Sequence, residues 1–83
     1  MKLSKYVKFR EEKFGGVLFE TQSEKVFTLN PTATAVVREI MEGVHEDQIA
    51  VRVAERFKGD ASTIQHEVRL FLRDLRSKGL AED

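Results

Sequence analysis

The chain contains no cysteine, no tryptophan and only one proline among its 83 residues. Without cysteine it cannot form a disulfide framework, a zinc knuckle, an iron–sulfur site or a thiol nucleophile. It also has no run near the ~20 apolar residues that span a bilayer, and the N-terminal segment 1–5 has no apolar stretch behind its lysines. We therefore expect a cytoplasmic protein, with no membrane partner, that folds without covalent cross-links.

An excess of charge of one sign is also absent, because 14 Lys and Arg residues balance 14 Asp and Glu residues. Small nucleic-acid-binding domains usually carry surplus positive charge, so the balance argues against nucleic acid as a partner. The hydrophobic fraction of 41% and the charged fraction of 34% are typical of a soluble globular domain. A chain of this size buries only about 60% of its unfolded surface and forms one small core. This excludes an enzyme with separate cofactor and substrate domains.

The first third of the chain has the alternating apolar pattern of β-strands. The adjacent glycines Gly15 and Gly16 are expected to form the turn between the first two strands, because glycine adopts turn conformations at little cost. A short polar segment then separates the second strand from the third. The three strands of the resulting antiparallel meander are predicted at residues 6–12, 17–20 and 25–29.

From Asn30 onward the apolar residues recur at intervals of three and four, as in amphipathic helices. Asn30 is a good N-cap and Pro31 suits the first helical position, so a helix should begin there and end near Gly43. A second helix is predicted over residues 46–57. The third helix should begin at one of two competing caps, Asp60 or the Ser62–Gln65 capping box, and continue to Lys78 before a Schellman stop at Gly79 and Leu80.

This order of elements predicts an α+β fold with a β-β-β-α-α-α arrangement. The second and third helices are joined by only a few residues, which is the spacing of a helix-turn-helix. The expected architecture is therefore winged-helix-like with its strands first, and residues 1–83 are expected to form a single domain.

No group of residues supports catalysis. His45 and His66 each lack a second histidine at the i+4 spacing of a helical metal site, and adjacent acidic residues such as Glu11 and Glu12 point in different directions. The glycine pair lacks the spacing of a nucleotide-binding loop. We expect neither an enzyme nor a bound metal or cofactor.

The third predicted strand is an edge strand, and edge strands present unpaired N–H and C=O groups. Phe27 and Leu29 share one face of it, Val26 and Thr28 share the other, and Lys25 is its only charged residue. An extended peptide could add to this edge as a fourth strand. The sequence pattern leaves open the alternative that a helix or a dimer partner covers the edge.

The third helix has a second candidate surface. Leu70 falls outside its apolar stripe, Arg69, Arg73 and Arg76 lie together on its outer side, and Lys78 completes the last turn. These arginines could compensate the helix dipole and keep the surface soluble. They could instead form a basic wall for an acidic peptide or a nucleic-acid backbone. The residues alone do not decide between the two interpretations.

Four segments of the chain form an ordered set: "FGGVLFE", "VFTLNPTA", "MEGVHEDQIAVRVAERF" and "VRLFLRDLRSKGL". Together, rather than through any single motif, they resemble the PqqD family, the small peptide chaperones of pyrroloquinoline quinone biosynthesis and the related precursor recognition elements of ribosomally synthesised, modified peptides. The resemblance covers residues 6–80. The first-strand region lacks the proline-containing opening of the quinone-pathway members, which places the chain closer to relatives from other peptide-modification pathways.

The resemblance implies a non-catalytic adaptor, monomeric or homodimeric, that binds the leader segment of a precursor peptide. It would deliver this peptide to a modifying enzyme, often a radical SAM protein of the SPASM type with auxiliary iron–sulfur clusters. The leader would add as a strand to Lys25, Val26, Phe27, Thr28 and Leu29, in a groove between that strand and the third helix. The implied helix wall is the segment that contains Arg69, Leu70, Arg73 and Arg76.

Two other functions remain open at this point. A winged-helix DNA-binding protein or transcription regulator would use the second and third helices and the three arginines. The zero net charge opposes it, as does a first helical turn, residues 61–65, without Arg, Lys or Asn. A structural dimerisation domain would instead pair the edge strand with its symmetry mate.

Overall fold

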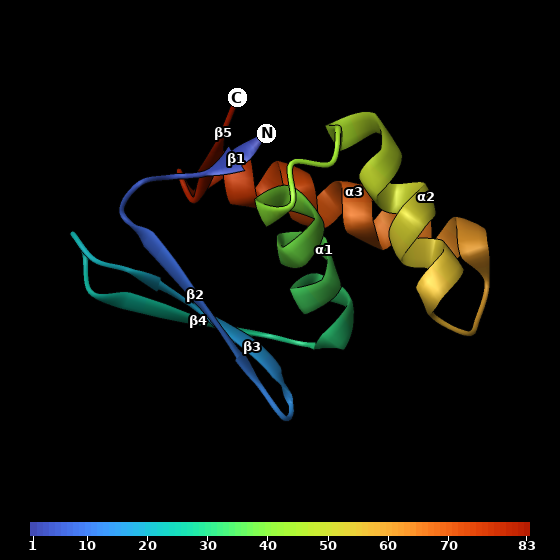
Figure 1. The fold of residues 1–83 in the computed structure, drawn as a ribbon, viewed down its shortest axis with the longest axis horizontal. Helices are drawn as coiled ribbons and strands as arrows, with labels where there is room; N and C mark the ends of the chain where they lie inside the picture. The colour runs from blue at the N-terminus through green and yellow to red at the C-terminus, as the bar shows by residue number, and fades with distance from the viewer.

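A computed structural model describes all residues, 1–83, and Figure 1 shows its arrangement. The predicted order of three strands followed by three helices is confirmed, as is the α+β, winged-helix-like class. Two short strands at the chain ends were not predicted. The elements are β1 (Lys2–Leu3), β2 (Val7–Glu12), β3 (Gly15–Glu20), β4 (Lys25–Leu29), α1 (Pro31–Met41), α2 (Glu46–Arg56), α3 (Ala61–Ser77) and β5 (Ala81–Glu82).

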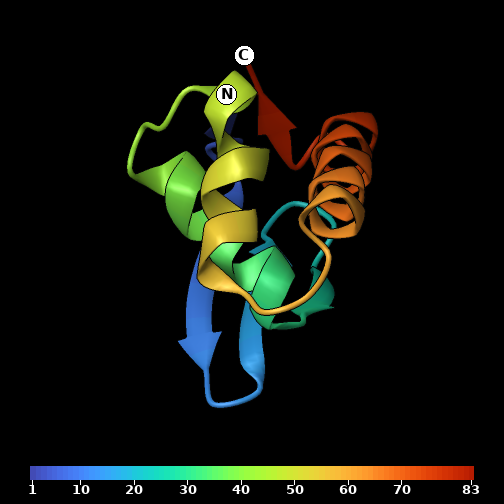
Figure 2. The same cartoon turned by 90° about the vertical axis from the view of Figure 1, so that its right-hand side faces the viewer.

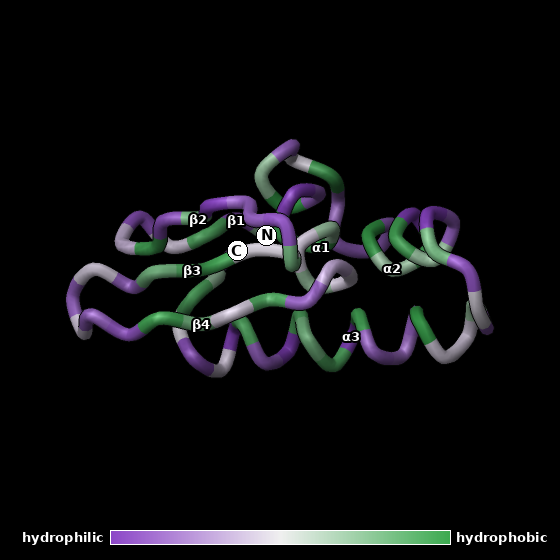
Figure 3. Tube along the Cα trace, turned by 90° about the horizontal axis from the view of Figure 1, so that it is seen from below, coloured by the Kyte–Doolittle hydropathy of each residue, from purple (hydrophilic) through white to green (hydrophobic).

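The main sheet is antiparallel with the strand order β2-β3-β4, so that β2 and β4 are its two edges. Helix α1 packs against both β3 and α2 and also contacts α3, so that it joins the sheet to the other two helices. Figures 2 and 3 both show α3 on the β4 side of the sheet, away from β2. The sheet therefore places one of its edges next to the longest helix.

The turn between β2 and β3 is formed by Lys13 and Phe14, so the prediction of a turn at the two glycines is wrong. Gly15 and Gly16 are the first residues of β3. Gly15 has φ of +147°, and a Cβ atom there would lie 2.1 Å from the carbonyl oxygen of Leu29. The glycines are needed because neighbouring backbone approaches them closely, which is a second reason for glycine in a strand.

One hydrophobic core lies between the inner face of the sheet and the three helices. The inner face carries Leu18, which is fully buried, with Val7 and Leu29. The outer face is open, and its Val26 is 60% exposed. The remaining buried apolar residues are Ala35, Val36, Val37, Ile40, Ile49, Ala50, Val53, Val68, Leu72, Leu75, Leu80 and Ala81.

The helix boundaries follow the caps that the sequence indicated. The side-chain oxygen of Asn30 accepts the N–H of Ala33 at 2.8 Å. Of the two caps considered for α3, Asp60 is the one used, and its carboxylate accepts the N–H of Thr63 at 3.0 Å. The predicted Schellman stop of α3 is confirmed, because the N–H of Leu80 bonds the carbonyl of Leu75 at 2.9 Å.

Replacing Asn30 with alanine should lower the free energy of unfolding by about 1 kcal/mol, because the N–H of Ala33 loses its acceptor. Asn30→Asp keeps an acceptor at the same place and should be close to neutral. Urea denaturation of the two variants measures the difference. Equal stability of the two would show that the cap contributes nothing to this connection.

The two ends of the chain pair with each other as β1 and β5, with Lys2 opposite Glu82 and Leu3 opposite Ala81. Figure 1 shows the N- and C-termini side by side. Strands of two residues have no periodicity that a sequence pattern could reveal. None of the helices is long and apolar enough to cross a membrane.

Candidate functional site

The register of the sheet determines which backbone groups of β4 are free. The N–H of Thr21 donates to the carbonyl of Tyr6 at 2.8 Å, which makes these two a hydrogen-bonded pair of the β2–β3 ladder. Hydrogen-bonded and non-hydrogen-bonded pairs alternate along an antiparallel ladder. The odd-numbered residues of β3 therefore bond to β2, and the even-numbered residues bond to β4.

It follows that β4 bonds to β3 through the three residues opposite the even positions of β3. These pairs are Glu20 with Lys25, Leu18 with Phe27 and Gly16 with Leu29. Val26 and Thr28 then direct their N–H and C=O groups to the free edge. Both also have exposed side chains, so this edge offers two donors and two acceptors to an added strand.

The two edges of the sheet differ in their suitability for pairing. β2 carries Lys8, Arg10, Glu11 and Glu12 among its six residues, and Glu11 is held by Arg38 of α1 at 2.6 Å. Charges of this density are a common protection of edge strands. β4 has only one charged residue, at its first position, so β4 is the edge that remains open to a partner strand.

A hollow of about 320 Å³ lies between the first half of β4 and the C-terminal end of α3. Phe27 and Leu80 form its apolar part, and Lys25 and Lys78 line it as well. The Lys78 ammonium lies 6.0 Å from the centre of the Phe27 ring and 2.6 Å from the Asp74 carboxylate. We call this space hollow A.

A second hollow, of about 100 Å³, lies beyond the other end of β4. It is bounded by Asn30 and the first turns of α1 on one side and by Glu67, Val68 and Phe71 of α3 on the other. We call it hollow B. Since the C-terminal end of α3 lies at hollow A and its middle, residues 67–71, lies at hollow B, α3 runs antiparallel to β4. The two hollows and the β4 edge between them form what we call the β4–α3 groove.

The structure places the arginines that were predicted to line this groove on the opposite flank of α3. Arg69, Arg73 and Arg76 line a hollow of about 370 Å³ together with three α2 residues, and Leu70, 45% exposed, is outside all three hollows. A helical pattern identifies the faces of a helix but not which neighbour each face meets. The α2 residues of that hollow are Glu46, Asp47 and Ala50.

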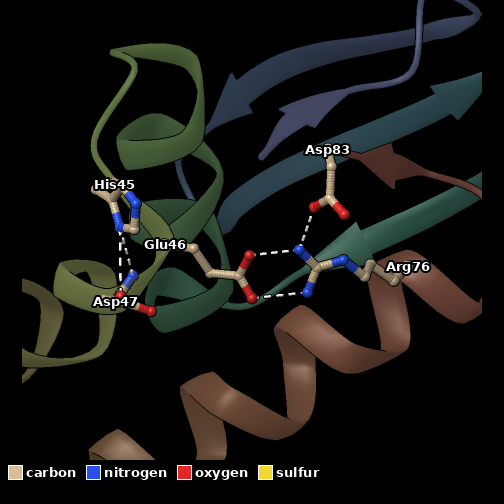
Figure 4. A network of polar contacts seen from close by, with 5 residues as sticks. All are labelled: His45, Glu46, Asp47, Arg76 and Asp83. Atoms are coloured by element: carbon tan, nitrogen blue, oxygen red, sulfur yellow. Dashed lines mark hydrogen bonds and ion pairs between the residues drawn. The ribbon is translucent and has the colours of Figure 1, made fainter.

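Arg76 holds three elements together, as Figure 4 shows. Its guanidinium donates to Glu46 at the start of α2, with a distance of 2.7 Å from Arg76 Nη1 to Glu46 Oε2, and also to Asp83 after β5. These hydrogen bonds hold the pKa of Glu46 and that of Asp83 below their usual values, and the two carboxylates raise the pKa of Arg76. Arg76 thus joins α3, α2 and the chain end.

Because these carboxylates have a lower pKa in the folded state, their contribution to stability is present above the unfolded-state pKa and is lost on acidification. We expect stability to fall from about pH 5 to about pH 3. Arg76→Gln should be less stable at neutral pH and should show a shallower fall. Thermal melts across this range, with Arg73→Gln as the control from the same flank, measure the two slopes.

A smaller acid-dependent loss of folding stability should remain in Arg76→Gln, because the pKa values of Glu20 and Asp60 are also lowered in the folded protein. That of Glu20 is lowered by the hydroxyl and backbone N–H of Ser23 and by the N–H of Gln22, and that of Asp60 by Thr63 and Ser62. An unchanged slope in the variant would contradict the role assigned to Arg76.

The residues of α3 and its C-cap that line the groove are Glu67, Phe71 and Lys78. The sequence analysis grouped Lys78 with the arginines of the candidate basic wall but assigned neither Glu67 nor Phe71 to the site. A signal for them was present. On a helical wheel they fall on one side of the core positions Val68 and Leu75, while the arginines fall on the other. The wheel could have separated the two flanks, although the contact with β4 was needed to choose between them.

No three His, Asp or Glu side chains of residues 1–83 gather as they would around a metal ion. His45 is the N-cap of α2, where its Nδ1 accepts the N–H of Asp47 at 3.3 Å. His66 is exposed on α3. Both histidines are exposed.

A strand edge beside a helix-walled groove is the feature to compare with known proteins. The model of the family described as coenzyme PQQ synthesis protein D (PqqD) matches residues 15–81, which is most of the chain. The chain belongs to the PqqD family. The match includes β3, β4 and all three helices, and therefore the whole β4–α3 groove. A comparison with curated protein sequences gives no match.

Two solved structures share the fold. TbiB1 in complex with the TbiA(beta) leader peptide is 26% identical, with a TM-score of 0.83 over 100% of both chains. A lasso peptide synthetase B1 complexed with its leader peptide is 18% identical, with a TM-score of 0.82 over 99% of this chain and 96% of that one. Both were solved with a leader peptide bound.

Proposed function

We propose that this protein is a non-catalytic recognition domain, spanning residues 1–83, that binds the leader segment of a ribosomally synthesised precursor peptide and presents it to a modifying enzyme. The observation that carries the proposal is the free edge at Val26 and Thr28 beside the β4–α3 groove. The PqqD family match and the leader peptide bound in the 26% identical structure support a leader peptide as the ligand of this edge.

The leader adds to β4 as a fourth strand. A disordered peptide loses conformational entropy when it docks, and the main-chain hydrogen bonds at Val26 and Thr28 offset part of that cost. Apolar leader side chains buried against Phe27 and Phe71 supply more. The binding surface consists of β4, from Lys25 to Leu29, and the groove flank of α3, with Glu67, Phe71 and Lys78.

The adaptor then raises the local concentration of the precursor at the enzyme, as a tether does. We propose a radical SAM enzyme of the SPASM type as that partner, since the PqqD resemblance implies one. The adaptor itself needs no catalytic group for this role. Catalysis improves because the core of the peptide stays near the active site of the partner.

The test is a titration of isotopically labelled protein with the TbiA(beta) leader peptide, which is bound in the 26% identical structure, and with the N-terminal segment of every short peptide that is found to be encoded near the gene of this protein. We expect the amide signals of residues 25–30 and those of Glu67, Phe71 and Lys78 to shift together. The amides near Arg69 and Arg73 serve as the internal reference because they face α2. Binding that shifts only this reference set, or no binding at all, would overturn the proposal.

A further inference from the structure

The two hollows of the β4–α3 groove lie at a separation that both of its walls define. Hollow A is centred between Lys25 and Phe27, and hollow B begins at Asn30. Four residues of strand correspond to ~13 Å. On α3, the distance from Lys78 to the middle of the 67–71 segment is nine residues, again ~13 Å of helix.

A strand added to β4 therefore reaches both hollows with residues four positions apart. Side chains alternate between the two faces of a strand, so residues i and i+4 point to the same face, and here that face is toward α3. Antiparallel pairing is slightly more stable than parallel pairing and continues the pattern of the sheet. The added strand then runs from hollow B to hollow A.

Hollow B fits an aliphatic side chain. Ala33, Val36, Val68 and Phe71 supply its apolar surface. The side-chain oxygen of Asn30 already accepts the N–H of Ala33. Thr32 and Glu67 are the other polar residues that line the hollow, and Glu67 is the only charged one. Apolar residues make up most of the lining, so an aliphatic side chain that enters the hollow meets mainly carbon.

Hollow A fits a side chain with an apolar stem and an acidic end. Phe27 and Leu80 contact the stem, and two lysines lie around them. Lys78 is already paired with Asp74 at 2.6 Å. Lys25 makes no ion pair, so its ammonium is the available partner for a carboxylate.

Glu20 also borders hollow A, but it does not remove the preference of this hollow for an acidic side chain. The carboxylate of Glu20 accepts the N–H groups of Gln22 and Ser23, each at 2.9 Å, and the hydroxyl of Ser23 at 2.5 Å. These hydrogen bonds hold it against the β3–β4 turn. Glu20 keeps its negative charge and attracts Lys25, which lies opposite it in the ladder. The two side chains form no ion pair, so the Lys25 ammonium can still meet a leader carboxylate.

Resting on the proposed function, we infer that the leader of this protein is recognised by two anchors: an aliphatic residue and, four positions later, an acidic residue with an apolar stem, such as glutamate. The aliphatic anchor enters hollow B and the acidic anchor enters hollow A, where Lys25 receives it. The fixed spacing selects the register of the added strand, which main-chain hydrogen bonds alone leave free to slip.

The experiment is a selection of binders from a displayed library of random twelve-residue peptides against the full chain. We expect the enriched peptides to share an aliphatic residue at i and Glu or Asp at i+4. In one enriched peptide, Glu→Lys at i+4 should weaken binding about fivefold, as expected of one exposed ion pair. Moving the acid to i+3 should weaken it about tenfold, because the side chain then points away from the groove.

A repeat selection on Lys25→Glu should replace the acidic preference at i+4 by Lys or Arg. Lys8→Glu is the matched control, because it makes the same charge change on the outer face of β2 and should leave the preference as it was. Enriched peptides that shift the amides of Val26 and Thr28 but lack this spacing would overturn the two anchors and leave strand addition standing. No enrichment, or binders that leave those amides unmoved, would overturn the proposed function as well.

Discussion

Replacing Val26 and Thr28 together with proline is expected to weaken leader binding by about 100-fold while the domain stays folded. The two prolines remove both N–H donors of the free edge and place a ring where the added strand must approach. Both changes fall on groups that face away from β3, and proline is accepted at such edge positions. Fluorescence anisotropy with a labelled leader measures the affinity, and circular dichroism measures the fold.

The register supplies two controls for this experiment. Val26→Ala with Thr28→Ala keeps both donors and should retain most of the affinity. Phe27→Pro should unfold the domain, because that N–H belongs to the ladder with Leu18 and its side chain is half-buried against the core. A double-proline variant that binds the leader like the parent chain would exclude strand addition at β4.

Much of the fold was accessible from the sequence, because its elements are signalled locally. Alternation marks the strands, the change of period at Asn30 marks the start of the helices, and Asp60 and Gly79 mark the limits of α3. The turn of the first hairpin was wrongly predicted at Gly15 because the need for glycine there is not local. Gly15 is required by the close approach of the Leu29 carbonyl, 14 positions away in the chain. A local sequence pattern cannot reveal such a contact.

The site could be predicted only in part, because some of its contacts are also between segments far apart in the sequence. The open edge follows from strand order and from the scarcity of charge in β4, both of which a sequence shows. The choice between the two flanks of α3 depends on which neighbour each flank meets. Arg69 and Arg73 were conspicuous because they are charged, yet Phe71 and Lys78 are the residues that border the groove.

The buried carboxylate of Glu39 is the feature that the sequence analysis missed altogether. It lies at 0% exposure within the apolar side of α1. Arg52 and Arg56, one helical turn apart on α2, approach it at 2.9 Å and 3.0 Å. An acidic residue inside an apolar stripe, with an i, i+4 arginine pair on the next helix, was the available signal. This cluster fixes α2 on α1 and so positions the helix on which α3 packs.

Removing both arginines should destabilise the domain by about 3–5 kcal/mol, because the double variant Arg52→Ala with Arg56→Ala leaves a buried charge without a partner. Either single variant should cost less, since the remaining arginine still faces the carboxylate. Adding Glu39→Met to the double variant should recover much of the loss, because a buried ion cluster can be replaced by an apolar side chain of similar size. Urea denaturation of the four chains gives the comparison. If the double variant is as stable as the parent, or if Glu39→Met brings no recovery, the cluster does not hold α1 and α2 together in the way that its geometry indicates.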